Sequence, residues 1–166
     1  IHGTAVAGLI AGVAGNGLGG VGVAFDATLA AFRILLSGEG SNPSPIVDDL
    51  GPQRAFERQL QAGVDVSNTS WGPDLAFTSN WGPSGRTADI AFGQAVVNFA
   101  TQGRDGLGSV VVVAAGNDHA NGSDANLINF SSSRHIIAVA AIDGTGTLSS
   151  YSTPGASLLV SAPGGP

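Results

Sequence analysis

His2 and Asn117 are the side chains in this sequence best suited to act on a carbonyl group. His2 heads a run of small apolar residues that predicts a helix, and the positive end of a helix dipole favours the neutral imidazole of a general base. Asn117 ends a buried apolar run, where a fixed amide can donate a hydrogen bond to an oxyanion. Each has a plainer explanation, because a lone histidine is more often structural and an asparagine after Gly116 often forms a turn. A general base also needs a nucleophile from elsewhere.

Metal and nucleotide sites have less support from residue spacing. His119 and His135 lie far from His2 in the sequence and lack the H-E-x-x-H arrangement of a zinc site, and the chain has no cysteine. The glycines within residues 15–20 match the dinucleotide pattern G-x-G-x-x-G. That pattern binds phosphates between a strand and a following helix, whereas here the expected helix comes first. Nucleotide binding is therefore a disfavoured alternative.

Apolar runs alternate along the chain with helix-like segments and with loops rich in glycine, serine and proline. Helices are expected at residues 3–14, 52–62 and 87–102, the first of them buried because it is apolar nearly all round. Strands are expected at residues 28–36, 64–70, 109–115, 135–142 and 157–162. The Val/Ala run 109–115 has the composition of a strand covered on both faces. Loops or turns are expected at residues 15–20, 37–45, 71–85, 116–134 and 144–146.

Strands separated by helices predict a parallel sheet with right-handed crossovers and helices on both faces. Ligands of such sheets bind beyond the carboxyl ends of the strands. The functional residues are therefore expected in the loops at residues 70–74, 116–124 and 162–165. In the first loop, Trp71 either covers the edge of the core or marks an exposed strand edge that pairs with an extended peptide.

The composition favours one layered unit and excludes some partners. Of 166 residues, 43% are hydrophobic and 11% are charged, which is enough apolar material to bury a core. Six arginines and no lysine stand against twelve acids, so the net charge is −6 and no basic face is available for nucleic acid. No apolar run reaches the roughly 20 residues of a membrane-spanning helix. The chain starts with Ile1 and is expected to be an excerpt of a longer polypeptide, whose oligomeric state the sequence does not indicate.

Four motifs occur in an order that resembles the subtilisin-like serine proteases, or subtilases. They are His2-Gly3-Thr4-Ala5-Val6-Ala7-Gly8, Ser70-Trp71-Gly72, Ala114-Ala115-Gly116-Asn117 and Ser161-Ala162-Pro163-Gly164. Residues 103–109 and 70–73 are more similar to the kexin and furin branch than to subtilisin itself. The resemblance covers essentially the whole chain. It implies an α/β fold with a three-layer, doubly wound parallel sheet of subtilisin type, truncated at both ends, so that residues 1–166 are the central part of one peptidase domain.

The resemblance also implies roles for individual residues of a serine endopeptidase. His2 matches the general base and Asn117 the asparagine of the oxyanion hole. Ser70, Trp71 and Gly72, together with Gly116, match segments that bind the substrate peptide. In the family, the catalytic aspartate precedes the histidine, and the catalytic serine follows a Gly-Thr-Ser motif. Neither the aspartate nor the serine is present among these 166 residues. The excerpt alone is therefore expected to be inactive.

Calcium and a secretory location are further implications of the resemblance. In relatives, the loop after the histidine helix wraps a calcium ion through backbone carbonyls and one asparagine side chain. Val13, Asn16, Leu18 and Gly20 fall on those places, and hard oxygen ligands of this kind are what calcium accepts. An ordinary glycine turn is the alternative. Most relatives are secreted or act in secretory compartments, so an extracytoplasmic location is expected.

Substrate preference is where the sequence departs from the kexin pattern. Kexin-like enzymes carry several acids after Ser-Trp-Gly-Pro, whereas only Asp74 follows here, so strict dibasic cleavage is expected to be absent. The expected partner is a peptide or protein substrate. The alternative within the same fold is a catalytically dead peptide-binding module, against which the intact His2 and Asn117 argue.

Overall fold

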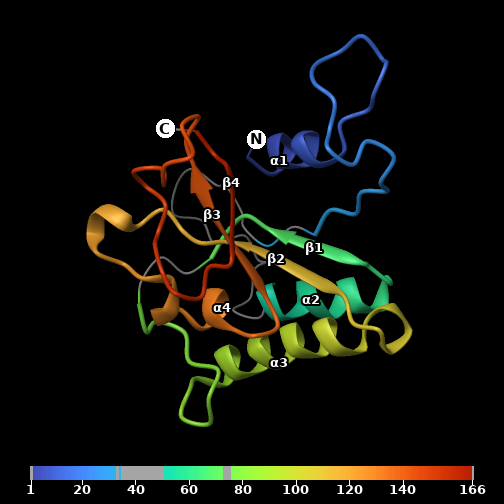
Figure 1. Cartoon of the computed structure of the whole chain (residues 1–166). Helices are drawn as coiled ribbons and strands as arrows, with labels where there is room; N and C mark the ends of the chain where they lie inside the picture. Colours follow the sequence, from blue (N-terminus) through green and yellow to red (C-terminus); the bar gives the residue numbers. More distant parts are fainter. Residues whose placement is uncertain (1, 33, 35–50, 73–75, 166) are drawn as a thin grey trace, which may run out of the picture. The chain divides into compact units, whose positions relative to one another are not determined.

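The computed structural model describes residues 2–32, 34, 51–72 and 76–165, which belong to two compact units, Ile1–Phe32 and Arg33–Pro166 (Figure 1). The expected loop at residues 37–45 and the position of Asp74 lie outside the described residues. In the described ranges, no helix has the length and apolar character needed to cross a lipid bilayer.

The first unit consists of one helix and the glycine-rich chain that folds back on it. Helix α1 (His2–Ala11) ends before Gly12 rather than at the expected residue 14. The returning chain is held by the Gly22 N–H, which donates to the Gly12 carbonyl (2.8 Å), and a side chain at Gly22 would collide with the backbone of Ala11. No residue of α1 is buried by the rest of this unit. A loop made largely of glycine has too few side chains to cover the helix.

Residues 28–32 form no strand, although a strand was expected at residues 28–36. A strand requires a neighbour with which its backbone N–H and C=O groups can pair. In the described part of the chain no strand pairs with these residues. Residues 33, 35 and 36 of the expected strand lie outside the described residues.

The second unit is built on a four-stranded sheet whose strands follow one another in sequence order. The strands are β1 (Val66–Thr69), β2 (Val110–Ala114), β3 (Ile137–Ile142) and β4 (Val160–Pro163). All three neighbouring pairs are parallel, with Val66 opposite Val110, Val112 opposite Ile137 and Val139 opposite Val160. The strands overlap four of the expected ranges, and the α/β class with a parallel sheet is confirmed.

Helices α2 (Gly51–Gln61) and α3 (Thr87–Gln102) cover one face of this sheet (Figure 1). Helix α3 has the expected bounds, and α2 begins one residue before the expected Pro52. Phe56 and Gln59 of α2 are buried together because residues three apart share a helix face. The buried core cluster consists of Phe56, Ala95, Val96, Phe99, Val111, Val113, Ile128 and Phe130. Each large side chain in it contributes about 1.5–3 kcal/mol by leaving water.

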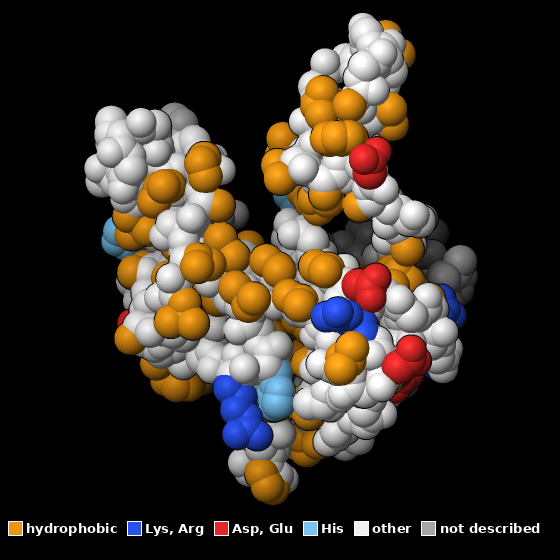
Figure 2. All heavy atoms as spheres, turned by 45° about the vertical axis from the view of Figure 1, so that its right-hand side comes forward, with side chains coloured by type: hydrophobic (Ala, Val, Ile, Leu, Met, Phe, Trp, Pro, Cys, Tyr) orange, Lys and Arg blue, Asp and Glu red, His pale blue; other side chains and the backbone are white. Residues whose placement is uncertain are grey.

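The opposite face of the sheet carries no helix of the second unit among the described residues. Strands in sequence order with right-handed crossovers place their connections on the same face. In β2, Val111 and Val113 are 1% and 2% exposed, whereas Val112 is half-buried and Ala114 is exposed. Within the second unit taken by itself, only one face of this strand is covered. Figure 2 shows a band of hydrophobic side chains across the larger unit.

The segment 116–134, expected to be one long loop, contains three short helices. These are η2 (His119–Asn121), η3 (Ala125–Leu127) and α4 (Asn129–Ser132), and a further one, η1 (Arg104–Gly106), follows α3. The Asp124 carboxylate starts η3 by accepting a hydrogen bond from the Asn126 N–H (2.8 Å). Helix α4 buries Phe130 against Phe56 and Trp71. Asparagine, serine and aspartate favour such short capped turns, so the polarity of the segment did not reveal them.

Candidate active site

A pocket lies at the carboxyl ends of β1 and β2, where the loops after two parallel strands meet. Its lining residues are Ser70, Trp71, Gly72, Val113, Ala114, Ala115, Gly116, Asn117, Ile128, Phe130 and Ser131. Two of the three loops expected to hold functional residues thus meet at one place, since carboxyl ends of neighbouring parallel strands share an edge. The third expected loop, residues 162–165, does not line this pocket.

Asn117 stands at the rim of this pocket with an exposed side chain. In the described part of the chain its amide makes no hydrogen bond with another residue. The chain reaches Asn117 through Gly116, whose φ of +108° lies in the region that glycine favours. A Cβ at Gly116 would also come within 2.9 Å of the Thr153 hydroxyl oxygen. Gly116 therefore allows the sharp turn that leaves the Asn117 amide free at the pocket.

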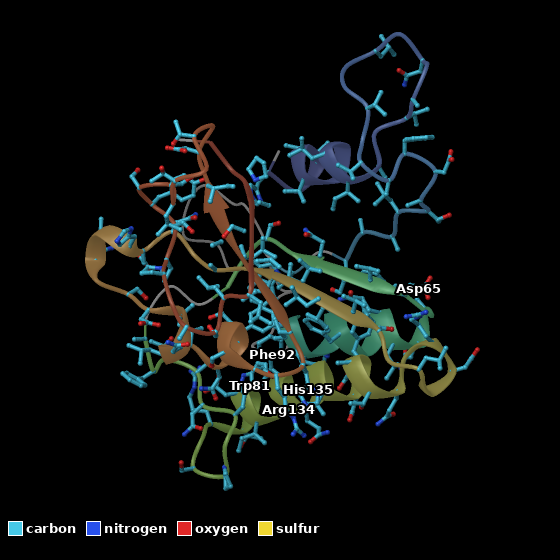
Figure 3. All side chains as sticks on the ribbon, in the orientation of Figure 1. Asp65, Trp81, Phe92, Arg134 and His135 are labelled. Carbon is cyan, nitrogen blue, oxygen red and sulfur yellow. The ribbon has the colours of Figure 1, made fainter. Side chains whose placement is uncertain are left out.

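The segment of Ser70, Trp71 and Gly72 continues from β1, the edge strand of the described sheet. The Trp71 ring is stacked on Phe92 of α3 (ring centroids 6.0 Å apart) and tilted against Phe130 (5.5 Å). Phe92 also contacts Trp81 (5.5 Å), and the two labelled residues lie close together in Figure 3. These aromatic contacts hold the Trp71 side chain, and with it the segment, against the core. A backbone held in this way at a sheet edge is suited to pair with an extended peptide.

The floor and walls of the pocket are largely apolar. Ile128 and Phe130 are 5% and 1% exposed, and no carboxylate is among the lining residues that the structure describes. The nearby acids have local partners: the Asp118 carboxylate accepts from the Asn121 amide (2.7 Å), and Asp124 caps η3. Such a lining is suited to an uncharged side chain.

His2 and the expected calcium loop belong to the first unit. His2 is the first residue of α1 and is exposed. Val13, Asn16, Leu18 and Gly20 are all exposed on the returning chain, where the Leu18 N–H donates to the Asn16 side-chain oxygen (2.9 Å). In the described ranges, the carbonyls of Val13, Leu18 and Gly20 accept no hydrogen bond from the backbone or side chains. Three free carbonyl oxygens and an amide oxygen are a hard donor set that fits calcium.

Within residues 2–32, 34, 51–72 and 76–165, no group of three or more histidine, aspartate or glutamate side chains could hold a metal ion.

Sequence reasoning missed the pocket residues Ile128, Phe130 and Ser131, and also Thr153 behind Gly116. The sequence did offer a signal for the burial of Phe130. It is the single Phe, Trp or Tyr in the polar segment 116–134, and such a residue needs an apolar place to pack. Thr153 gave none. It lies in a stretch of serines, threonine and proline that reads as an ordinary loop.

Known proteins provide independent comparisons for this chain. The profile of the subtilase family matches residues 1–166. "Proprotein convertase subtilisin/kexin type 7" of Mus musculus is 32% identical over 161 residues, which are 95% of this chain and 19% of that protein. Subtilisin DY of Bacillus licheniformis is 37% identical over 164 residues, which are 98% of this chain and 51% of that protein. The chain therefore spans about a fifth of the convertase and half of the subtilisin.

Solved structures share the fold. The crystal structure of MycP1 with its N-terminal propeptide removed matches with a TM-score of 0.71 at 24% identity, covering 98% of this chain and 52% of MycP1. MycP3 protease from the type VII (ESX-3) secretion system matches with a TM-score of 0.67 at 26% identity, covering 98% of this chain and 48% of MycP3. Because the family profile matches residues 1–166 and the fold is of subtilisin type, the chain belongs to the subtilase family.

Proposed function

We propose that these residues form part of the catalytic domain of a serine endopeptidase, with His2 as the general base and Asn117 as the oxyanion donor. The observation that carries the proposal is the meeting of Ser70, Trp71 and Gly72 with Gly116 and Asn117 at one pocket. Membership of the subtilase family supports it. In this proposal the serine nucleophile and the aspartate that orients His2 come from outside the 166 residues.

The reaction transfers the acyl part of a peptide to the serine and then to water. The serine oxygen attacks the scissile carbonyl carbon while His2 accepts the hydroxyl proton, and the new oxyanion accepts a hydrogen bond from the Asn117 amide N–H. When the C–N bond breaks, His2 gives its proton to the leaving amine. Water then attacks the ester carbonyl and gives a proton to His2, which returns it to the serine oxygen as the ester C–O bond breaks.

Covalent labelling of the full-length protein with a fluorophosphonate, followed by peptide mapping, tests this function. We expect one labelled serine that lies outside residues 1–166, and loss of the label in a His2→Ala variant because the serine is then no longer activated. An unlabelled but folded protein that still binds peptides would overturn the proposal in favour of a catalytically dead peptide-binding module.

We propose that the pocket takes an uncharged side chain of the substrate, so that strict cleavage after basic pairs is absent. An arginine or lysine buried between Ile128 and Phe130 would need a carboxylate partner, and the described lining residues offer none. A peptide series that varies only the residue before the scissile bond tests this. We expect kcat/KM to be about 10- to 100-fold higher for leucine or phenylalanine than for arginine. An absolute requirement for arginine or lysine would contradict it.

We propose that calcium binds the loop after α1 through the carbonyls of Val13, Leu18 and Gly20 and the side-chain oxygen of Asn16. The ion would cross-link a glycine-rich loop that has few side-chain contacts of its own. Melting curves of the full-length protein with calcium, with magnesium and with chelator test this, and Asn16→Ala is the matched variant. We expect calcium alone to raise Tm, and by less in the variant. Equal Tm values in all conditions would contradict the proposal.

A further inference from the structure

Asn117 can act as an oxyanion donor only if the chain around it is held in place. Donors of this kind stabilise a transition state because they are fixed before the reaction, within about 0.5 Å of the productive position. The Asn117 side chain is exposed and has no partner among the described residues. Its position is therefore set by the backbone on either side of it.

Thr153 binds both peptide units that flank Asn117. Its backbone N–H donates to the Gly116 carbonyl (3.0 Å), and its hydroxyl oxygen accepts a hydrogen bond from the Asp118 N–H (3.0 Å). Thr153 is only 1% exposed, so these bonds do not compete with water. One residue thus fixes the chain immediately before and immediately after the asparagine.

Thr153 is itself tied to the sheet through its neighbours. The Ser152 hydroxyl accepts a hydrogen bond from the Ala141 N–H of β3 (3.0 Å), and the Pro154 carbonyl accepts one from the Ala125 N–H (2.8 Å). Gly116 lets the two segments approach this closely, because a Cβ at that residue would lie 2.9 Å from the Thr153 hydroxyl oxygen. The segment that carries Thr153 is therefore tied to both β3 and η3.

We propose that Thr153 is a positioning residue that holds the Asn117 amide in the oxyanion hole through its two hydrogen bonds to Gly116 and Asp118. This inference rests on the proposed function of Asn117. Thr153 acts on the reaction through Asn117 and does not touch the substrate.

Steady-state kinetics on the full-length protein test the role of Thr153. Thr153→Val keeps the shape of the side chain but removes the acceptor for the Asp118 N–H, whereas Thr153→Ser keeps the hydroxyl. We expect kcat to fall by about 10- to 100-fold in Thr153→Val, as for a small misplacement of a catalytic group, with KM nearly unchanged. Thr153→Ser should retain most of the wild-type kcat. A Thr153→Val variant with wild-type kcat would overturn the inference.

A double-mutant cycle with Asn117→Ala separates positioning from general loosening of the fold. If Thr153 acts through Asn117, Thr153→Val costs little further kcat once the amide is gone. An equal fold-loss of kcat in both backgrounds would overturn the inference while leaving the oxyanion role of Asn117 intact. If Asn117→Ala alone leaves kcat unchanged, the proposed function fails and this inference with it. Ser149→Ala is the matched control for the loss of a buried hydroxyl. Ser149 is as buried as Thr153 and lies in the same turn, but its hydroxyl donates to the Gly165 carbonyl instead.

Hydrogen exchange gives a readout that does not depend on how well the variants fold. In the unmodified protein, the Asp118 amide should exchange slowly, because its N–H is bonded to a buried hydroxyl. Exchange of that amide at the rate of an open loop would overturn the inference.

Discussion

Asn117 differs from most polar side chains near it in having no intramolecular partner within the described residues. Asp118 binds Asn121, Asp124 binds the Asn126 N–H, and Asn126 in turn accepts from the Ser157 N–H (2.8 Å). Most polar groups that are fixed near a surface satisfy one another in this way. An amide kept free beside an apolar pocket is available to a substrate, whereas the polar groups of these neighbours are already bonded.

Replacing Asn117 with alanine should impair catalysis without affecting stability. We expect kcat of the full-length protein to fall by about 10²–10³-fold with little change in KM, which is the size known for losing this donor in a subtilisin. Tm should stay the same, because the exposed amide has no bond to lose in the described part of the fold. A fall in Tm that parallels the fall in kcat would assign Asn117 a structural role instead.

The candidate site residues could be named from the sequence, but their supports could not. Ser70, Trp71, Gly72, Gly116 and Asn117 occur in short motifs whose order is distinctive, and the structure brings them to one pocket. Thr153 is joined to Gly116 and Asp118 only by tertiary contacts that lie far apart in the sequence. No local pattern encodes such a contact.

Helix α3 starts at an ion pair that makes its stability depend on pH. Arg86 donates from Nε and Nη2 to the two carboxylate oxygens of Asp89 (2.9 Å each). This hydrogen bonding holds the pKa of Asp89 below its ordinary value of 3.8; burial opposes the effect, and the Asn80 backbone N–H adds to it. Because the folded-state pKa is depressed, the stabilisation is fully present above pH 3.8 and is lost as the pH falls through the lower folded-state value.

The variant Asp89→Asn should therefore lower the free energy of unfolding at neutral pH by about 1 kcal/mol, since it removes the ion pair and a negative charge at a helix start. The difference from the wild type should shrink as the pH falls below 3.8, where Asp89 itself loses its charge. Urea melts of the full-length protein between pH 7 and about pH 2.5 measure this, with Asp105→Asn in the exposed η1 as the control. A difference that is constant over that range would contradict the prediction.

Gly93 in the middle of α3 is explained by the ring that packs on it. Glycine costs a helix interior about 1 kcal/mol relative to alanine, yet a Cβ at Gly93 would lie 2.6 Å from the Trp81 ring atoms Cγ and Cδ2. These atoms are close to the Trp81 backbone and cannot swing away. The close approach keeps Trp81 next to Phe92 and Phe130.

We expect Gly93→Ala to destabilise the protein by about 1–3 kcal/mol in spite of its better helix propensity, because it overpacks this contact. In a Trp81→Ala background the same substitution should be neutral or stabilising. Urea melts of the full-length protein and the tryptophan emission of the single variant measure both effects. Higher stability of Gly93→Ala in the unmodified background would show that the contact is loose.

The elements that local chemistry dictates were predicted best. Helix α3 matched its expected bounds because apolar spacing and a closing Gly103 both act within the helix. Residues 28–32, which have a similar apolar composition, are not a strand, because strand formation depends on a partner from elsewhere. Composition likewise shows that α1 and both faces of β2 need covering, but not which part of the chain covers them.

At the scale of the whole molecule, the two faces of the sheet are unequal. One face is closed by α2 and α3, and the other leaves Val66, Ile137 and Val160 exposed by 57%, 42% and 48%. The register places Val112 beside Ile137 and Val139 beside Val160, so these side chains adjoin along the face. Contiguous apolar surface of this kind normally contacts further protein.

The isolated 166-residue chain should therefore unfold without a sharp transition. A sheet with one apolar face uncovered loses much of the burial that makes small domains cooperative, and a dye such as ANS binds such a face. In urea melts we expect a broad transition whose midpoint differs between tryptophan fluorescence and far-UV circular dichroism. We also expect ANS emission in the absence of urea. The full-length protein is the control and should show coincident, steep transitions and little ANS emission. A single steep transition by both probes in the isolated chain, without dye binding, would mean that its residues already close their own core.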